Sequence, residues 1–560
     1  MAVLGFQLAT TLIAASILSK IVSFYSFTRF LYNGLFRLVV PSDQQLLEAL
    51  GNHKTKSKGK KRRADSSAGG AGFGNGDTSN VFYFPRSMSI QLKSSKVSAT
   101  DATVLPLYSN LQWLLDFTVC TLGVYFVSEI AQGCFGSWFD GNPRNITSAG
   151  QPLSQVISLN TRINLSLVWL SLTVWFAVRT LISMTGIYFR SSAANDSQKS
   201  ESRPTGSSSS STGTNTSSSA DCMLVVAAGF CFLVAAVFFL SLDDRYFDFG
   251  LRLAYGNLTV QNTDFTTAPI ISRGAFQSIL ALISAFIGAL FVYPGLKFGK
   301  VYLDSVNKHR NSAGKRILLH LSFFSPLIPL LLWIPPLTDH ISRSLTVLMH
   351  STFVAKNPIW LVGTTTALEL FTVHLATIHL LSCVLVVLLR IGTVRWNLQT
   401  YLSAAQDKLD RFSKEPGRTS NREVQRLVAS VFYCLNLVAL QLVAPTILLL
   451  ALVCLLKSVA GIAWLPTHCV KHDSVSVSTD PLNAYNYSVP SILDSSSSQY
   501  SWSATIIQAR FAFTQITSNL GARGSVVARG VLRFLVWWCL FALQAVNLLG
   551  FAYHRFTADE

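Results

Sequence analysis

Long uninterrupted apolar runs constrain this chain more than any other feature of its sequence. A helix needs about 19 apolar residues to span ~30 Å of hydrocarbon, and nine such windows recur along the 560 residues. They are 1–19, 111–132, 165–187, 222–242, 275–296, 317–337, 366–389, 428–457 and 531–553. The strands of a membrane barrel would instead alternate apolar and polar residues over ~10 positions. The sequence therefore predicts an all-α polytopic membrane protein, a bundle of about nine transmembrane helices.

Composition supports a membrane protein, and the first run decides the topology. Only 13% of the residues are charged, against the ~25% typical of soluble domains, and the mean hydropathy is positive. No basic residue precedes the run 1–19, and no A-x-A-like cleavage site follows it. We predict an uncleaved first helix with its N-terminus outside. If the run were a cleaved signal peptide, eight helices would remain and every loop would change sides.

Basic residues are distributed unequally between the two sets of loops. With the N-terminus outside, the cytoplasmic segments are 20–110, 188–221, 297–316, 390–427 and 554–560. These hold 31 lysine and arginine residues, and the opposite loops, which include the large loop 458–530, hold 11. Because basic residues are retained on the cytoplasmic side, the asymmetry predicts a cytoplasmic C-terminus. The sequence leaves open whether the membrane is the plasma membrane or the endoplasmic reticulum.

The predicted outside loops carry features of secreted surfaces. Sequons begin at Asn145, Asn257 and Asn486, so we predict a glycoprotein with N-linked glycans at these sites. Cys134 and Cys469 are the two cysteines in outside loops. Any disulfide of the protein would therefore join these two residues.

Two cytoplasmic segments have the composition of disordered chain. The Ser-rich loop 188–221 has little apolar surface to bury, and the run "KTKSKGKKRR", Lys54–Arg63, is almost entirely basic. This run fits a solvated tail, and it also fits binding to anionic lipid head groups at the membrane surface. Nuclear targeting does not fit nine membrane spans, so no nucleic-acid partner is expected.

One cytoplasmic segment has helical periodicity. Apolar residues recur at spacings of three and four residues along one stripe: Leu398, Leu402, Ala405, Leu409 and Phe412. Pro416-Gly417 then ends the helix, and Ser420-x-x-Glu423 has the form of a capping box for the next one. We predict an amphipathic linker helix within 390–427. Its stripe could pack on the protein's own bundle, or it could dock on a partner protein or on the membrane surface.

Ionisable residues lie within the predicted spans, where they are costly. Asp116 and Glu129 are 13 residues apart in one span, hence about 20 Å apart along the helix axis. Span seven carries Glu369 and His379 on one small or polar face, and Arg179 in span three is a candidate partner. These residues fit interfacial or helix-packing roles, and they also fit an ion or proton path.

Chemical motifs are missing from the sequence. It has no phosphate loop, nucleophile elbow or HExxH motif. The run "HCVKHD", His468–Asp473, lacks the further ligands that a metal site needs. We therefore expect no enzyme activity, no cofactor and no metal.

Segments spread along the whole chain resemble one known family. They include "GFQLATTLIAASILSKI", "QWLLDFTV", "FVYPGLKFGKVYLDSVN", "LQTYLSAAQDKLD", "GRTSNREVQRLVASVFY" and "RGVLRFLVWW". In this order they resemble the transmembrane protein 161 family. The resemblance implies a multi-pass membrane protein without established enzymatic activity. It also implies links to cell excitability, including heart rhythm, through effects on ion currents, and to protection against oxidative stress.

Two functional hypotheses follow. The first is a non-enzymatic membrane protein that modulates ion currents, membrane excitability or stress signalling by binding ion channels or other membrane proteins. The second is a transporter or ion channel that uses the carboxylates and the histidine within its spans. Both place the chain in a lipid bilayer.

Overall fold

A computed structural model describes residues 2–48, 82–86, 90, 92–139, 165–201, 217–242, 246–247, 249–259, 272–349, 375–460, 462 and 502–559. Its helices are α1 (Ala2–Phe24), α2 (Phe27–Tyr32), α4 (Ala99–Thr103), α5 (Tyr108–Phe139), α7 (Leu165–Glu201), α8 (Ser217–Ser241), α9 (Leu251–Thr259), α10 (Arg273–Leu290), α11 (Val292–Lys308), α12 (Ala313–Phe324), α13 (Leu327–Leu332), α14 (Pro335–Met349), α16 (Leu375–Lys414), α17 (Asn421–Tyr433), α18 (Leu435–Ala460) and α19 (Trp502–Asp559). Its strands are β1 (Phe36–Leu38), β2 (Tyr83–Pro85), β3 (Ser94–Lys96) and β4 (Arg418–Ser420).

The apolar runs form membrane-length helices. Eight helical segments of the described chain are long and apolar enough to cross a membrane: Tyr108–Ile130, Ser166–Arg190, Met223–Ser241, Arg273–Leu290, Ala313–Leu332, Leu375–Lys414, Asn421–Ala460 and Val526–Thr557. Each overlaps one of the last eight predicted windows, which confirms the all-α polytopic fold class. The first window lies in α1, whose apolar segment Thr11–Val22 is shorter.

Prolines move two of the predicted boundaries. The window 275–296 is divided into two helices. Helix α10 ends at Leu290, and α11 has Pro294 in its first turn. A backbone N–H in the first turn has no partner within the helix, so proline can occupy this position without breaking a helical hydrogen bond. The window 317–337 is broken next to Pro326 and again at Pro335, so α12, α13 and α14 follow one another as short helices.

Span seven and the predicted linker are one continuous helix. The sequence analysis placed a boundary at residue 390, but α16 runs without interruption from Leu375 to Lys414. No proline interrupts the backbone hydrogen bonds of this stretch. The first strong helix breakers are Pro416 and then Gly417, and the φ of Gly417 is +138°. The linker residues are therefore helical, but they continue the helix of span seven and do not form a separate helix.

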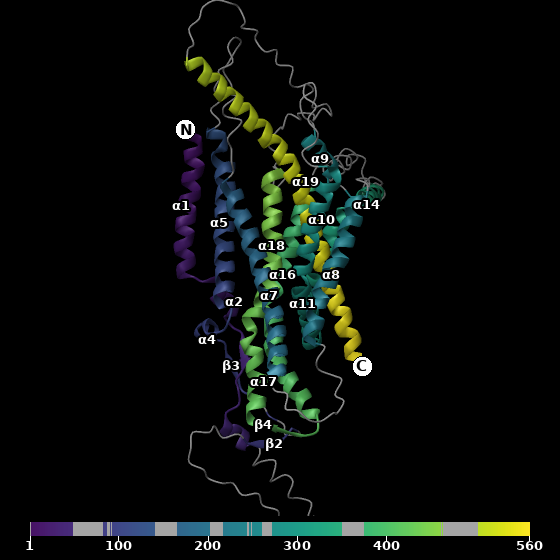
Figure 1. Ribbon diagram of the computed structural model, residues 1–560. Coiled ribbons are helices and arrows are strands. Elements are labelled where there is room, and N and C mark those ends of the chain that lie inside the picture. Colours follow the sequence, from purple (N-terminus) through teal and green to yellow (C-terminus); the bar gives the residue numbers. More distant parts are fainter. Residues whose placement is uncertain are drawn as a thin grey trace, which may run out of the picture.

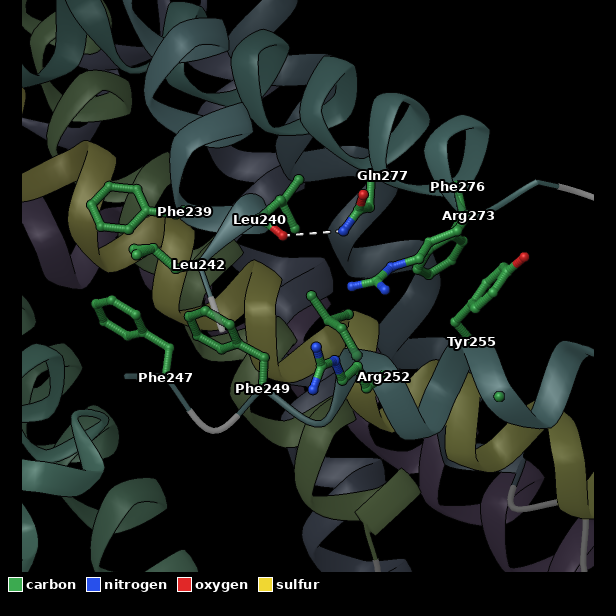
Figure 2. Close-up of a pocket in the computed structure, with 12 residues that line it drawn as sticks. Phe239, Leu240, Leu242, Phe247, Phe249, Arg252, Tyr255, Arg273, Phe276 and Gln277 are labelled. Atoms are coloured by element: carbon green, nitrogen blue, oxygen red, sulfur yellow. Dashed lines mark hydrogen bonds between the residues drawn. The ribbon is translucent and has the colours of Figure 1, made fainter. Parts of the chain in front are cut away.

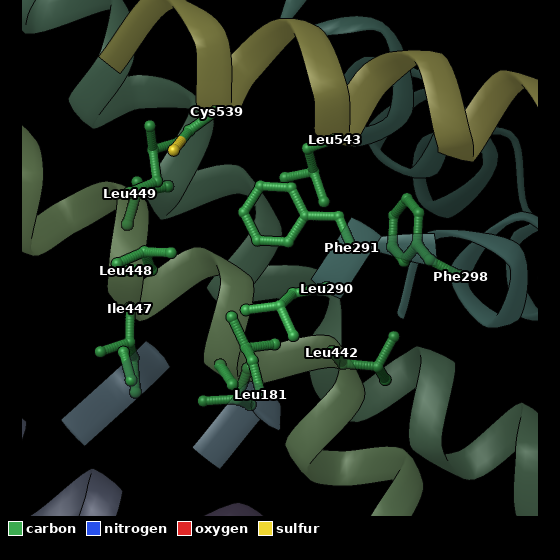
Figure 3. Packing of buried hydrophobic residues seen from close by; sticks show 14 of the residues in the cluster. Leu181, Leu290, Phe291, Phe298, Leu442, Ile447, Leu448, Leu449, Cys539 and Leu543 are labelled. Atoms are coloured by element: carbon green, nitrogen blue, oxygen red, sulfur yellow. The ribbon is translucent and has the colours of Figure 1, made fainter. Parts of the chain in front are cut away.

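Helix α18 occupies the centre of the bundle. Of its apolar window, 89% is buried inside the protein, compared with 17% for the window of α8. It packs against α5, α7, α16 and α19, and α1 lies at one edge of the bundle against α5 (Figure 1). Side chains from α7, α10, α18 and α19 interdigitate around Leu448 and Leu449 (Figure 3). The two termini lie at opposite ends of the bundle (Figure 1).

A small base forms beyond the membrane helices, at the end of the bundle away from the N-terminus (Figure 1). Strand β1 pairs antiparallel with β3, with Phe36 opposite Lys96, and β2 pairs antiparallel with β4, with Tyr83 opposite Ser420. Three of these strands come from the predicted loop 20–110. Its described parts are therefore ordered by the α16–α17 connection, whereas Lys54–Arg63 lies outside the described residues.

Two glycines allow α11 and α19 to cross at close range. A Cβ atom at Gly299 would lie 2.6 Å from the backbone nitrogen of Phe551, and one at Gly550 would lie 2.8 Å from the Cα of Leu296. Backbone atoms cannot move aside as the end of a side chain can, so neither position has room for a methyl group. The helices can pack as they do only with glycine at both positions.

Replacing Gly299 or Gly550 by alanine is expected to destabilise the protein by about 3 kcal/mol, at the upper end of the usual effect of overpacking. The measurement is thermal unfolding of the purified protein in detergent. The matched control is Gly392→Ala, because a Cβ at this α16 position has no neighbour within 4 Å. This control should be neutral or stabilising, since alanine favours helix over glycine. Equal effects at all three glycines would contradict the close crossing.

Candidate functional site

A seam of buried polar side chains follows α16 where it faces α11 and α12. Arg390, Thr393, Asn397 and Thr400 are all buried, and their spacing places them on one helical face. The Oγ of Ser305 on α11 donates to Oδ1 of Asn397 at 3.1 Å. The hydroxyls of Ser322 on α12 and Thr393 lie 3.0 Å apart. These hydrogen bonds join three helices through polar groups that lipid could not satisfy.

Arg390 is the unusual member of the seam. Its residue surface is only 5% exposed, and its guanidinium lies 4.8 Å from the ring centre of Phe298 on α11. Its Nε and Nη2 atoms are buried and donate to no acceptor among the residues that the structure describes. A buried cation without an acceptor is costly. The seam therefore has the chemistry to hold a water molecule or an anion beside Arg390.

The predicted polar face of span seven is only partly visible. Glu369 lies outside the described residues. The ring of His379 is half-buried and stacks on Trp333, with 5.1 Å between the ring centres. The suggested partner Arg179 is exposed on α7. His379 thus joins α16 to the end of α13.

Glu129 forms an ion pair with Lys457. The carboxylate belongs to α5 and the ammonium to α18, and the two side chains are 22% and 9% exposed. Lys457 also lies 5.9 Å from the ring centre of Tyr125. This pair attaches α5 to the central helix, which is a helix-packing role.

Asp116 lies apart from this pair. Its Oδ1 accepts a hydrogen bond of 3.2 Å from the backbone N–H of Phe27, at the start of α2. The N-terminal N–H groups of a helix lack partners within it, so a carboxylate is favourable there. Asp116 and Glu129 therefore hold different neighbours of α5 and do not form one site.

The predicted amphipathic stripe faces the protein's own interior. Leu398, Leu402, Ala405 and Leu409 are at most 4% exposed, and Phe412 is partly buried. Leu409 packs with Leu46, Phe84 and Val424 in a small core of the base, and Phe412 lies against it. Docking of this stripe on a partner or on the membrane surface is therefore wrong, because the chain itself covers it.

The base is held to α16 by polar contacts as well. Gln399 accepts from the backbone N–H of Phe36 at 2.8 Å and donates to its carbonyl at 3.1 Å, which extends the pairing of β1. Arg86 forms an ion pair with Glu415 at 2.7 Å, and its guanidinium lies 4.3 Å from the ring centre of Phe412. The two loops of the base thus hold each other in place.

Three lysines lie along α11, outside the candidate membrane spans: Lys297, Lys300 and Lys308. Burial, together with the positive charges of Lys300 and Lys408, lowers the pKa of Lys297 to about 8. Its ammonium lies 5.0 Å from the ring centre of Tyr401. Burial also lowers the pKa of Lys308, which Asp407 opposes. Lys297 therefore loses its charge as the pH rises through about 8.

The remaining predicted sites are described only in part. Asn145, Asn486 and Cys469 lie outside the described residues, as does His468–Asp473. Asn257 and Cys134 fall in the helices α9 and α5, and nothing is described of their side chains. Within the described ranges, no group of three His, Cys, Asp or Glu residues could hold a metal ion. Glycosylation and the disulfide remain predictions.

The seam and the pairing of Glu129 with Lys457 were not predicted from the sequence. Arg390 was assigned to the first position of a loop, because the window 366–389 ended the predicted span. Extending the helical count past this window would have placed Arg390, Thr393, Asn397 and Thr400 on one face. By contrast, no signal in the sequence pairs Glu129 with Lys457, since 328 residues separate them.

One family of known sequences matches nearly the whole chain. The model of the family described as "predicted transmembrane protein 161AB" matches residues 2–142, 151–200 and 210–558. The three matched ranges include every described helix and strand except parts of their ends. No solved structure matches the chain.

Proposed function

The chain belongs to the transmembrane protein 161AB family, and on this premise we propose that it is a non-enzymatic membrane protein that modulates ion currents, membrane excitability or stress signalling. It acts through membrane protein partners such as ion channels. A role in heart rhythm and in the response to oxidative stress belongs to the same proposal. Its membrane is the plasma membrane, the endoplasmic reticulum or both.

The filled centre of the bundle supports this proposal most. Nearly every residue of α18 from Leu435 to Lys457 is buried, and most of these side chains are leucine, valine or alanine. A conducting bundle needs polar groups along a water-filled path. Glu129 and Asp116, which could have lined such a path, hold neighbouring helices instead. A protein with an apolar, filled centre is better suited to bind partners at its outer surface than to conduct ions through its centre.

The orientation forms part of the proposal. We place the N-terminus outside and the base, with the C-terminus, in the cytoplasm. The excess of basic residues in the loops on that side supports this orientation. The position of the termini at opposite ends of the bundle agrees with it (Figure 1).

A transporter or channel is the second candidate, and the polar seam of α16 favours it. The Nε and Nη2 atoms of Arg390 are buried without an acceptor among the described residues, and an intramembrane cation of this kind often marks an ion pathway. The seam lies where α16 faces α11 and α12. Any path for an anion would therefore follow this side of α16.

Flux through the purified protein separates the two candidates. We expect vesicles that contain wild-type protein to pass no more chloride, potassium or protons than empty vesicles. Expression in excitable cells should nevertheless change the currents recorded under voltage clamp. The variants for both assays are Arg390→Gln and, as a control, Arg179→Gln, which removes an exposed arginine of α7. A flux that Arg390→Gln abolishes and Arg179→Gln leaves intact would overturn the modulator in favour of the transporter.

A further inference from the structure

One arginine lies in the middle of a membrane-length helix and faces outward. The candidate span of α7 runs from Ser166 to Arg190, which places Arg179 about 20 Å from one end and about 16 Å from the other. Arg179 is exposed. Within the parts of the chain that the structure describes, its guanidinium makes no hydrogen bond and no ion pair. An arginine at this depth is costly in lipid, and such residues usually face the interior of a bundle.

Several other arginines of the chain lie at the ends of spans or outside them. Arg190 ends the span of α7, and Arg273 begins the span of α10. Figure 2 shows Arg273 beside a cavity that it shares with Arg252 of α9, which lies outside the candidate spans. At this level an arginine can extend its long side chain to water and to lipid head groups. From the middle of a hydrocarbon core ~30 Å thick, the side chain of Arg179 is too short to reach either.

The surface around Arg179 is an open and mostly apolar stripe. Residues at spacings of three and four share its face of α7, and these include the exposed Trp175 and Ile182. Ser183 is exposed one turn further along, and a Cβ atom added at Gly186 would have no neighbour within 4 Å. Small side chains allow the backbone of a second helix to approach closely. The stripe therefore has room for one more membrane helix.

The charge of Arg179 specifies what this further helix carries. A guanidinium stays protonated in proteins, and a carboxylate is the acceptor that also compensates its charge. In a second copy of this chain, the two carboxylates of α5 are already engaged, because Asp116 accepts from Phe27 and Glu129 pairs with Lys457. A lipid head group lies too far from the middle of the span. These observations favour the membrane helix of another protein.

We propose that this face of α7 binds a membrane helix of a partner protein, and that an aspartate or glutamate near the middle of the partner helix pairs with Arg179. The proposal rests on the proposed function, because it supplies the contact that would hold a membrane partner. The pair is favourable within hydrocarbon, where neither charge can be solvated by water. It also gives specificity, because a helix without the carboxylate leaves the arginine uncompensated.

A model helix tests the pairing with purified components. The probe is a synthetic peptide of about 20 leucine and alanine residues with one central glutamate, and its counterpart has glutamine at that position. Full-length protein and peptide, each with a fluorescent label, are reconstituted in phosphatidylcholine vesicles, and binding is measured by Förster transfer. We expect the wild type to bind the glutamate peptide about tenfold more tightly than the glutamine peptide. Equal binding of the two peptides would overturn the proposal, and this comparison needs no variant that folds.

Variants locate the binding site on α7. Arg179→Gln should bind both peptides equally. The control Arg190→Gln removes an exposed arginine at the end of the same span and should bind as the wild type does. Arg179→Glu should prefer a peptide with a central arginine, because the exchange restores the pair with its charges reversed. A preference for the glutamate peptide that persists in Arg179→Gln would contradict the proposal.

Two outcomes would assign the face to a different occupant and so refute the proposal. If the wild type binds neither peptide but Glu369→Gln binds the glutamate peptide, the chain's own carboxylate holds Arg179. If the protein without peptide is a dimer that Arg179→Gln dissociates, a second copy covers the face.

Recordings in excitable cells separate this proposal from the proposed function. Arg179→Gln should lose the effect on currents that Arg190→Gln retains, whereas flux through vesicles of purified protein, which contain no partner, should not change. An effect on currents that survives in Arg179→Gln would overturn the role of this face. If the wild type has no effect on currents, the proposed function fails, but a preference for the glutamate peptide still supports the site.

Discussion

Leu402→Asp is expected to destabilise the protein by about 5 kcal/mol and to prevent recovery of folded protein from detergent. Leu402 is 2% exposed in the contact between α16 and the rest of the bundle. The substitution removes a buried leucine side chain and places a carboxyl group, without a partner, in an apolar core. The measurement is the yield of monodisperse protein in size-exclusion chromatography, followed by thermal unfolding.

The control for this substitution is Lys408→Asp, which introduces the same side chain at an exposed position of the same helix. It should leave the yield and the unfolding temperature close to those of the wild type. If Leu402→Asp folded as well as Lys408→Asp, the stripe would not be buried. Because the stripe faces inward, a loss of function in Leu402→Asp reports a folding defect rather than a lost partner.

Lys457→Met should be the other strongly destabilising substitution, with an expected loss of about 4 kcal/mol. It leaves the carboxylate of Glu129 without its partner at a largely buried contact between α5 and α18. Removing one member of a buried ion pair is far worse than replacing both, because the remaining charge is uncompensated. The free energy of unfolding in detergent or the unfolding temperature measures the effect.

The double variant Glu129→Gln/Lys457→Met tests the cause of this loss. It should recover most of the stability, since no uncompensated charge remains. The reversed pair Glu129→Lys/Lys457→Glu should also be more stable than either single reversal. Additive losses in both double variants would show that the two side chains act independently, and the ion pair would then have no structural role.

The sequence alone predicted the membrane spans correctly because their signal is local. Each span depends on the summed transfer free energy of about 19 consecutive residues. Windows such as 111–132 and 222–242 therefore matched α5 and α8 closely. The Ser420 cap was also predictable, and its Oγ accepts from the backbone N–H of Glu423 at 3.3 Å. The Glu423 side chain instead accepts from Thr419 at 2.7 Å.

The base could not be predicted from the same pattern. The loop 20–110 has few apolar residues in regular spacing, and its composition favours disorder. Leu46 and Phe84 become buried only because α16 supplies Leu409 and α17 supplies Val424. Contacts between segments that lie more than 300 residues apart leave no periodic signal in either one.

The sequence thus determined where the long apolar helices lie, while only the tertiary structure decided which side chains face each other. The physical reason is the solvent. In water, an apolar stripe reveals the buried face of a helix, but lipid is as apolar as a helix interface. Helices α8 and α18 are both strongly apolar, yet 17% of one window and 89% of the other are buried. The partner of Glu129 and the seam at Arg390 both depend on which face of each helix is buried.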